Sequence, residues 1–378
     1  MRWAVMFMIA CGSNSPSTPT IDAPNRVVDA PAPDAGLAIT EGILDPTFGT
    51  NGVVTLDLGG SELAGRVTRE PSGRIVISGG MLFGFTSDGR LDTSFGNDGE
   101  VAVTSSFADL VAANDDLYLL SSTLGAERHL ATGEVDTTYG DQGKSTLING
   151  TIGVEQIPGG ATVDTEGRVI STFLDATSHV RVIRFLANGI EDSQFTRVDL
   201  GPGYQALPVA VQSDKKILVG RSPNGESTAI VRLADNGTVD PSYNPPVATA
   251  ANVPTRGLVT TADDHAWLAG FVLSGGYYFD HLTSAGAETP GFPISFTVGD
   301  IVKIVALPDG GVIGVGVAPG PVGFAIAVSA DGLRATRWTI GGSLFGVCVG
   351  TDGSVYVAGG SAPPGDPSDD LLVAKLSL

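Results

Sequence analysis

The chain alternates short apolar runs with polar turns, and this alternation recurs about every 48 residues from residue 43 onward. The unit around residues 206–243 shows the order most clearly. Its apolar segments at 206–211, 216–220, 229–233 and 239–243 are separated mostly by turns rich in Asp, Asn and Gly. Apolar runs of this length between such turns are typical of β-strands. Each unit therefore predicts four short strands, and seven units follow one another.

A short motif, in which an aromatic residue follows an Asp by three positions, opens the fourth strand of most units. The aspartates are Asp45, Asp92, Asp136, Asp192 and Asp240, and the aromatic residues are Phe48, Phe95, Tyr139, Phe195 and Tyr243. In the later units, where the motif fades, Phe292 or Trp338 takes the aromatic place. A residue that occurs once per unit favours packing between units over ligand binding. We therefore predict buried rings, and Asp side chains that cap their turns.

A repeat of this length and strand content predicts an all-β fold, a seven-bladed β-propeller of four-stranded blades. The two ends of the repeat differ in phase. The last unit ends at residues 371–376 without a fourth strand, whereas residues 43–58 match a fourth strand without the three before it. We predict that these two segments pair and close the ring, because closure removes two exposed sheet edges.

Glycine is abundant, with 52 residues, and it recurs near the end of the second strand of most units. These positions are Gly79, Gly220, Gly270, Gly316 and Gly359. Glycine at matching points of a strand indicates close approach of another backbone, as crowding near a central axis requires.

The first residues have the layout of an export signal. Arg2 precedes a short apolar run that ends in Met8-Ile9-Ala10-Cys11. This ending resembles the lipobox of bacterial lipoproteins, and the resemblance implies cleavage before Cys11 and lipidation of that cysteine. We therefore assign residues 1–10 to a lipoprotein-like signal peptide, 11–40 to a disordered tether rich in Pro, Ala, Asp and Ser, and 41–378 to the propeller.

Three segments that recur in the units carry a family resemblance: Leu-Asp-Pro-Thr-Phe-Gly, Asp-Gly followed by a basic residue and β-branched residues, and Arg-Leu followed by an Asn-Gly or Asp-Gly turn. Together they resemble the delta-60 repeat family of exported bacterial proteins, whose members are similar to NHL-type propellers. The resemblance covers residues 43–378. It implies the fold, but it brings no catalytic residues.

Charge and reactive residues narrow the possible chemistry. The 41 acidic residues against 21 basic ones give a net charge of −20, which argues against a nucleic-acid partner. We expect no cofactor, and calcium at the Asp-rich turns is the alternative. Cys348 lies in an apolar run and is predicted to be a buried, inert thiol. The cluster Tyr277-Tyr278-Phe279 predicts strand packing, with a sugar-stacking platform as the alternative.

The chain contains four histidines, and none has the partners that a catalytic or metal site needs. They are His129, His179, His265 and His281. His129 and His281 fall at or next to the position that Arg184 and Arg232 hold in other units, and His265 is predicted to lie in an exposed turn. We predict no catalytic or metal-binding role for them.

These observations lead to a hypothesis of function. We expect an exported, lipid-anchored propeller that acts as a binding module at the bacterial cell envelope, or is secreted if the lipobox is not used. A monomer with a protein or glycan partner is expected, in contact with a membrane only through its lipid. The alternatives are a glycan-active hydrolase or lyase with its site at the mouth of the central channel, and a purely structural envelope protein.

Overall fold

Small antiparallel sheets make up the part of the chain that the structure, a computed structural model, describes. The described residues are 37–57, 65–103, 107–113, 116–121, 125–148, 157–195, 197–203, 205–222, 229–243, 255–272, 275–320, 322–361 and 370–378. The predicted signal peptide and residues 11–36 of the predicted tether lie outside these ranges. Within them the chain forms strands β1 to β27 and contains no helix that is long and apolar enough to cross a lipid bilayer.

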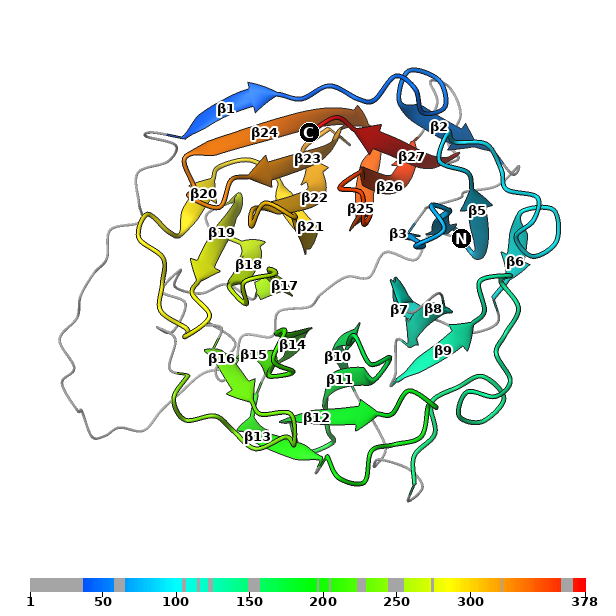
Figure 1. The fold of residues 1–378 in the computed structure, drawn as a ribbon. Helices are drawn as coiled ribbons and strands as arrows, with labels where there is room; N and C mark the ends of the chain where they lie inside the picture. Colours follow the sequence, from blue (N-terminus) through cyan, green and yellow to red (C-terminus); the bar gives the residue numbers. More distant parts are fainter. Residues whose placement is uncertain are drawn as a thin grey trace, which may run out of the picture. The chain divides into compact units, whose positions relative to one another are not determined.

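Seven sheets stand around a central axis, as Figure 1 shows, and each is one blade. Blades 1 and 2 contain β3 (Arg66–Arg69), β4 (Ile75–Ser78), β5 (Met81–Phe85) and β6 (Glu100–Ala102), then β7 (Phe107–Ala113), β8 (Asp116–Ser121) and β9 (Ala126–His129). Blades 3 and 4 contain β10 (Ile157–Val163), β11 (Val169–Leu174), β12 (His179–Phe185) and β13 (Val198–Pro202), then β14 (Gln205–Val211), β15 (Ile217–Ser222) and β16 (Ala229–Leu233).

The remaining three blades follow the same order. Blade 5 contains β17 (Thr255–Thr260), β18 (Ala266–Phe271), β19 (Tyr277–Leu282) and β20 (Ile294–Phe296). Blade 6 contains β21 (Asp300–Ala306), β22 (Val312–Ala318), β23 (Val322–Val328) and β24 (Arg334–Gly341), and blade 7 contains β25 (Ser343–Val349), β26 (Val355–Ser361) and β27 (Asp370–Leu376). The first strand of each blade is innermost, and each inner strand contacts the next until β25 returns to β3.

The predicted ring closure is confirmed. Strand β2 (Val53–Leu56) pairs antiparallel with β27, with Val53 opposite Ala374 and Leu56 opposite Leu371. Blade 7 therefore takes its outer strand from the start of the described chain and its other three from the end. The seven-bladed, all-β propeller that the repeat predicts is the observed fold.

Two blades depart from the four-strand plan among the described residues. In blade 2 the outer strand is reduced to a single bridge between Glu127 and Lys144. In blade 4 the segment after Tyr243 lies outside the described residues. The plan is otherwise kept, because the hairpins that build each blade have the same turn geometry. Lys215 and Asp264 even adopt the left-handed backbone conformation (φ 68° and 65°) that Gly residues hold in the equivalent turns.

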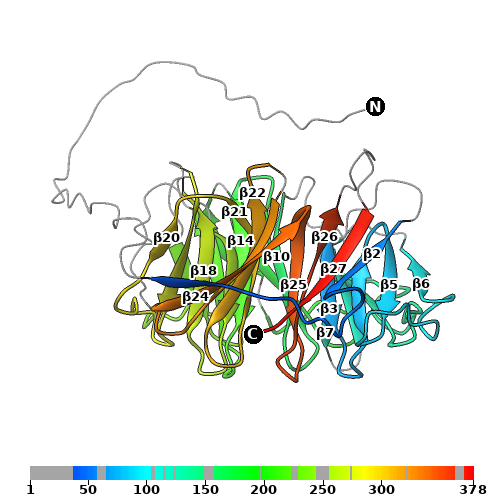
Figure 2. The same cartoon turned by 90° about the horizontal axis from the view of Figure 1, so that it is seen from above.

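Blade 6 carries an additional strand that the repeat does not predict. Strand β1 (Ala38–Glu41) runs parallel to β24, with Ala38 opposite Arg334 and Glu41 opposite Arg337. Figure 2, which turns the molecule by 90°, shows β1 lying along β24 at the rim. Residues 38–40 fall in the range that we assigned to the tether. These residues, Ala-Ile-Thr, are exposed, and they form a strand by pairing with the edge of β24.

Candidate functional site

The inner strands share one irregularity that shapes the channel. The pairing between first and second strand shifts register once in blades 2 to 7, always in the first half of the inner strand. A β-bulge of this kind bends the strand and turns a side chain in a new direction. The ring therefore presents bulges in the same part of six inner strands around the channel.

The predicted close approach at the second-strand glycines is confirmed where these bulges lie. A Cβ at Gly316 would sit 1.9 Å from the carbonyl oxygen of Asp300, and one at Gly359 would sit 1.8 Å from that of Ser343. Both glycines pair next to a bulge of the inner strand. The crowding that selects glycine therefore comes from the neighbouring strand of the same blade.

The half of the channel where the inner strands begin is charged. Lys303 in β21 donates a hydrogen bond to the Oδ1 atom of Asp109 in β7. The Nε atom of Arg66 in β3 lies 3.6 Å from the same oxygen, and its Nη1 atom donates to the Phe345 carbonyl at 3.1 Å. These contacts join the inner strands of blades 6, 7, 1 and 2. The Asp109 carboxylate is the counter-ion of both cations and so links inner strands of three blades.

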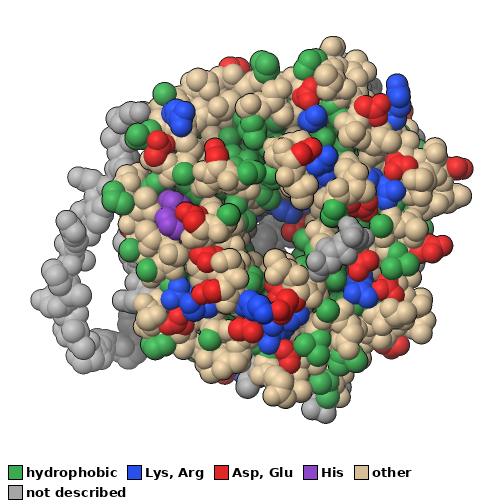
Figure 3. Space-filling view, in the orientation of Figure 1, with side chains coloured by type: hydrophobic (Ala, Val, Ile, Leu, Met, Phe, Trp, Pro, Cys, Tyr) green, Lys and Arg blue, Asp and Glu red, His purple; other side chains and the backbone are tan. Residues whose placement is uncertain are grey.

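The other half of the channel is lined by aliphatic and hydroxyl-bearing side chains. The ends of β10, β14, β17 and β21 line a pocket of about 470 Å³. Its wall includes Thr162, Val163, Val211, Thr260 and Val305. The hydroxyl of Thr260 donates to the Val211 carbonyl at 2.7 Å, so its oxygen keeps an acceptor site available. Figure 3 shows one face of the ring, hollowed at its centre.

Polar side chains from the hairpin turns surround the mouth of this pocket. The Gln212 amide donates to the Asp264 carbonyl at 2.7 Å, and the Ser213 hydroxyl donates to the Asp264 carboxylate at 2.7 Å. Lys215 pairs with Glu166 of the neighbouring blade. These contacts tie blades 3, 4 and 5 together, so the rim of the pocket is ordered before any ligand arrives.

The motif residues that the sequence singled out are confirmed as structural. The five aromatic rings are all buried, and so are the rings of Phe292 and Trp338. The Oδ1 atom of each motif Asp accepts a hydrogen bond from the backbone two residues later, as at Asp45 and Asp240, where the distance is 2.9 Å. In Asp240 the hydroxyl and backbone N–H of Ser242, helped by Arg232, lower the pKa to about 2.

In several blades an arginine of the third strand contacts the motif Asp and aromatic ring of its own blade and also the backbone of the next blade. The Arg184 Nη2 atom lies 2.7 Å from the Asp192 carboxylate, and the guanidinium lies 4.6 Å from the centroid of the Phe195 ring. Its Nη1 atom also donates to the Asp235 carbonyl of blade 4 at 2.5 Å. Arg128 and Arg232 repeat this arrangement, with donors to Ala187 and Ser284 of the following blades.

The histidines lie apart from the channel pocket. As predicted, His281 occupies the position of Arg184 and Arg232 in its blade, and His129 lies one residue beyond it. The two ring nitrogens of His129 contact Glu127 and the Gly133 carbonyl, each at 2.8 Å. Burial, followed by the charge of His265, lowers the pKa of His281 to about 4.

His265 lies at the predicted turn but is less exposed than predicted. Its side chain is 29% exposed, because its ring packs 5.1 Å from that of His281. The turn is therefore partly covered by the neighbouring strand. Among the described residues, no group of three or more His, Cys, Asp or Glu side chains is arranged to hold a metal ion.

The remaining predicted residues are buried or lie outside the described ranges. Tyr277, Tyr278 and Phe279 are buried in blade 5, as strand packing requires, and offer no sugar-stacking surface. Cys348 is buried in β25, and burial raises the pKa of its thiol to about 12, so the reactive thiolate is disfavoured. Cys11, the predicted lipidation site, lies outside the described residues.

Sequence reasoning missed the channel residues. Lys303 is the only charged residue in the run Ile301–Ala306, and a lone cation in an apolar strand was the available signal. Its partner Asp109 is 194 positions away, so the sequence had no local signal for the pair.

One family model matches part of the chain. A family model described as a domain of unknown function (DUF5122) beta-propeller matches residues 212–243, which lie in the clearest unit of the repeat. No protein of curated function matches the sequence.

Three solved structures illustrate the similarity. The extracellular domain of a putative one-component system from B. thetaiotaomicron is 11% identical with a TM-score of 0.49; the match covers 87% of this chain and 40% of that one. A putative gluconolactonase is 11% identical, with coverages of 89% and 97% and a TM-score of 0.42. The calcium-binding protein regucalcin from Agrobacterium tumefaciens is 11% identical, with coverages of 90% and 96% and a TM-score of 0.44.

Proposed function

We propose that this chain is an exported propeller of the delta-60 repeat family that acts as a binding module at the bacterial cell envelope. Its partner, a protein or a glycan, binds in the pocket at the mouth of the central channel. The observation that carries the proposal is the pocket of about 470 Å³, to which four blades contribute. Pockets of this size with a few placed polar groups are typical of ligand sites.

The side chains around the pocket favour binding over catalysis. The Asp164 carboxylate at its rim receives a hydrogen bond from Arg168 at 2.6 Å, so it is held as an ion pair. Glycoside hydrolysis needs a carboxyl group with a raised pKa beside the substrate. Asp280 has such a pKa, raised to about 6 by burial and by Glu288, but it does not line the channel pocket.

We further propose that Cys11 anchors the protein to a membrane and that the propeller is a monomer. Support comes from the lipobox-like residues 8–11 and from the Pro-rich segment that follows them. The net charge of −20 supports a partner other than nucleic acid. Anchoring is tested by expressing the full chain in a Gram-negative host with labelled palmitate. Label and membrane fractionation should be lost in Cys11→Ala and kept in Cys348→Ala, and equal labelling of both variants would reject the anchor.

Binding at the channel is tested with a variant that blocks its mouth. Ala262 is exposed in the turn that borders the pocket, so Ala262→Trp adds a large ring there. Ala131→Trp makes the same change in an exposed turn of blade 2 and serves as the control. The melting temperature of each full-length variant is measured with a panel of envelope glycan fragments, and each variant is used to capture envelope proteins.

A ligand that binds at the channel raises the melting temperature of the parent and the control but not of Ala262→Trp. The same comparison applies to a captured protein. A ligand bound equally by both Trp variants would place the site elsewhere on the propeller. Turnover of a glycan by the parent would favour the enzymatic alternative.

A further inference from the structure

The seven blades offer an internal comparison at one position of the third strand. Arg128, Arg184 and Arg232 hold it in blades 2, 3 and 4, and Lys375 holds it in blade 7. In blade 1 this position is Gly84, and Arg74 supplies the guanidinium, with its Nε atom 2.7 Å from Asp92. In blades 1 to 4 the guanidinium also donates to a backbone carbonyl of the next blade, whereas Lys375 contacts Asp45 and the Tyr356 ring of its own blade.

Blades 5 and 6 lack this cation, and they replace it differently. In blade 5 the His281 ring stacks on Trp267 at 4.4 Å, and the Trp267 Nε1 atom donates to the Gly310 carbonyl of blade 6 at 3.0 Å. Aromatic rings therefore take the place of the cation and reach the next blade. In blade 6 the residue is Ala327, a short side chain in an apolar cluster that includes Leu344 and Val355 of blade 7.

A pocket of about 630 Å³ lies beside Ala327, on the border between blades 6 and 7. Its floor is aliphatic: Leu307, Ala327, Val328 and Ala335 are all buried. Leu378, which is 65% exposed, forms another part of its wall. The pocket therefore occupies the place that a cation or aromatic rings take in the other blades. Most of its lining is apolar.

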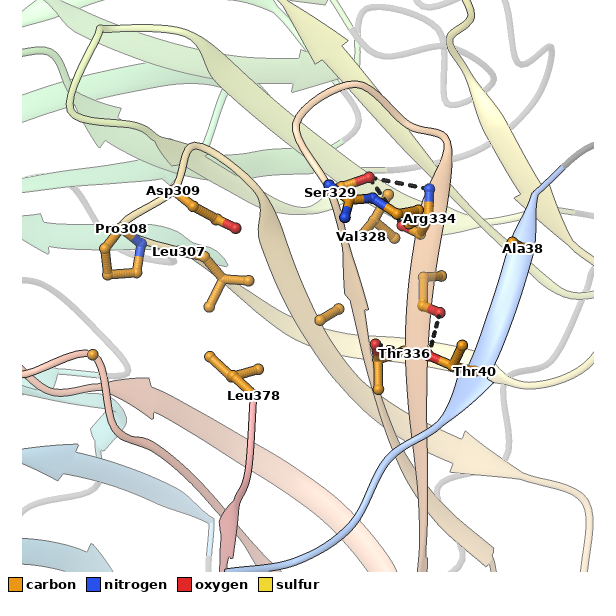
Figure 4. A pocket seen from close by; sticks show the side chains of 13 residues that line it. Ala38, Thr40, Leu307, Pro308, Asp309, Val328, Ser329, Arg334, Thr336 and Leu378 are labelled. Atoms are coloured by element: carbon orange, nitrogen blue, oxygen red, sulfur yellow. Dashed lines mark hydrogen bonds between the residues drawn. The ribbon is translucent and has the colours of Figure 1, made fainter.

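Charged side chains from two different turns border the pocket. Figure 4 shows Arg334 and Ser329 on one side, Asp309 with Leu307 on another, and Leu378 between them. Arg334 is exposed, and within the described ranges its guanidinium makes no side-chain hydrogen bond or ion pair. The Ser329 hydroxyl and then the Leu333 backbone lower the pKa of Asp331, and the charge of Arg334 adds to the effect. The Arg334 guanidinium keeps hydrogen-bond donors available for a further anion.

We propose that this pocket binds an aliphatic carboxylate, with its chain on the floor around Ala327 and its carboxylate at Arg334. An apolar pocket within about 300–1,000 Å³ and with one oriented charge is suited to a small amphiphile. Asp309 repels an anion from the opposite side, so it sets the direction of the ligand. This site is separate from the channel pocket, and its existence does not depend on the function proposed there.

The chain length of the ligand gives a quantitative test. Sodium octanoate and sodium decanoate are titrated calorimetrically into the full chain carrying Cys11→Ala, which cannot be lipidated. Each methylene buried on the floor should strengthen binding about fourfold, so decanoate, with two more methylenes, should bind roughly fifteenfold more tightly than octanoate. Decanol and decylamine, which lack the carboxylate, should bind more weakly than decanoate.

Two variants test the two parts of the site. Arg334→Gln should weaken both acids by about tenfold and leave their ratio unchanged, because only the charge-assisted hydrogen bond is lost. Arg90→Gln, which neutralises an exposed arginine of blade 1, is the matched control and should change nothing. Ala327→Arg introduces the arginine that blades 2, 3 and 4 have at this position, should fill the pocket, and should abolish binding of both acids.

Several outcomes would overturn the proposal. Undiminished binding to Ala327→Arg, equal affinity for octanoate and decanoate, or no difference between Arg334→Gln and the parent would each do so. Tighter binding of decylamine than of decanoate would assign the site to a cation and Asp309. If Ala327→Arg melts well below the parent, its loss of binding could come from misfolding. The chain-length series and Arg334→Gln then test the proposal, because both leave the core unchanged.

Discussion

Arg184 shows how one residue type holds neighbouring blades together. Its guanidinium pairs with Asp192, packs on the Phe195 ring and donates to the backbone of blade 4. Both charged side chains are only 6% exposed. A buried pair of this kind costs desolvation to form, but breaking it leaves one charge buried without a partner.

We therefore expect Arg184→Met to destabilise the protein by about 3–5 kcal/mol, because Asp192 would stay buried and unpaired. Arg90→Met is the control: Arg90 is 85% exposed beside Asp88, and its loss should cost less than ~1 kcal/mol. Urea unfolding of the two variants against the parent measures both values. Similar costs for the two variants would mean that the Arg184 pair contributes no more than a surface ion pair.

Strand β2 is the element on which closure of the ring depends. The Lys375 N–H donates to the Gly52 carbonyl at 3.0 Å, next to the pair of Val53 with Ala374. In an antiparallel ladder, the residues that point their N–H groups at the partner strand alternate. The N–H of Val54 therefore points at β27, and that of Thr55 points away from it.

Proline at these two positions should give different results. Val54→Pro removes a ladder hydrogen bond and leaves a carbonyl of β27 unpaired, so we expect a loss of about 1–3 kcal/mol. Thr55→Pro removes an N–H that faces outward from an edge strand and should cost clearly less. Thermal unfolding of the two full-length variants measures the difference, and a greater loss in Thr55→Pro would contradict the register of β2.

The molecule as a whole combines a net charge of −20 with aspartates whose pKa values are held low. In Asp92, Asp136 and Asp240 the first cause is the hydrogen bond from the hydroxyl two residues later. A carboxyl group whose pKa is lower in the folded than in the unfolded state contributes stability above the unfolded pKa, near 4. That contribution is lost as the pH falls toward the folded pKa.

We therefore expect the melting temperature to fall by ~10 °C or more between pH 5 and pH 2.5. Above pH 5 the change should be small, because most carboxyl groups are already ionised there and the effects of His281 and Asp280 oppose each other. Calorimetry of the parent and of Asp136→Asn/Asp240→Asn tests this. The double variant should be less stable at pH 6, and its melting temperature should decrease less as the pH falls. A parent protein that gains stability below pH 4 would contradict the prediction.

Much of the architecture was determined by the sequence alone. The period of the apolar runs predicted seven blades, the phase of the two ends predicted the closing pair of β2 and β27, and the motif predicted buried rings and capping aspartates. Each of these follows from local preferences for strands and turns, repeated often enough to be read along the chain.

The sites were decided only by the tertiary structure. The Lys303–Asp109 contact joins residues 194 positions apart, and the channel pocket needs four inner strands side by side. The pocket beside Ala327 lies where blade 6 has neither the cation of five blades nor the aromatic rings of blade 5, and β1 and Leu378 border it. Such features depend on which distant segments meet, and no local pattern of apolar and polar residues records that.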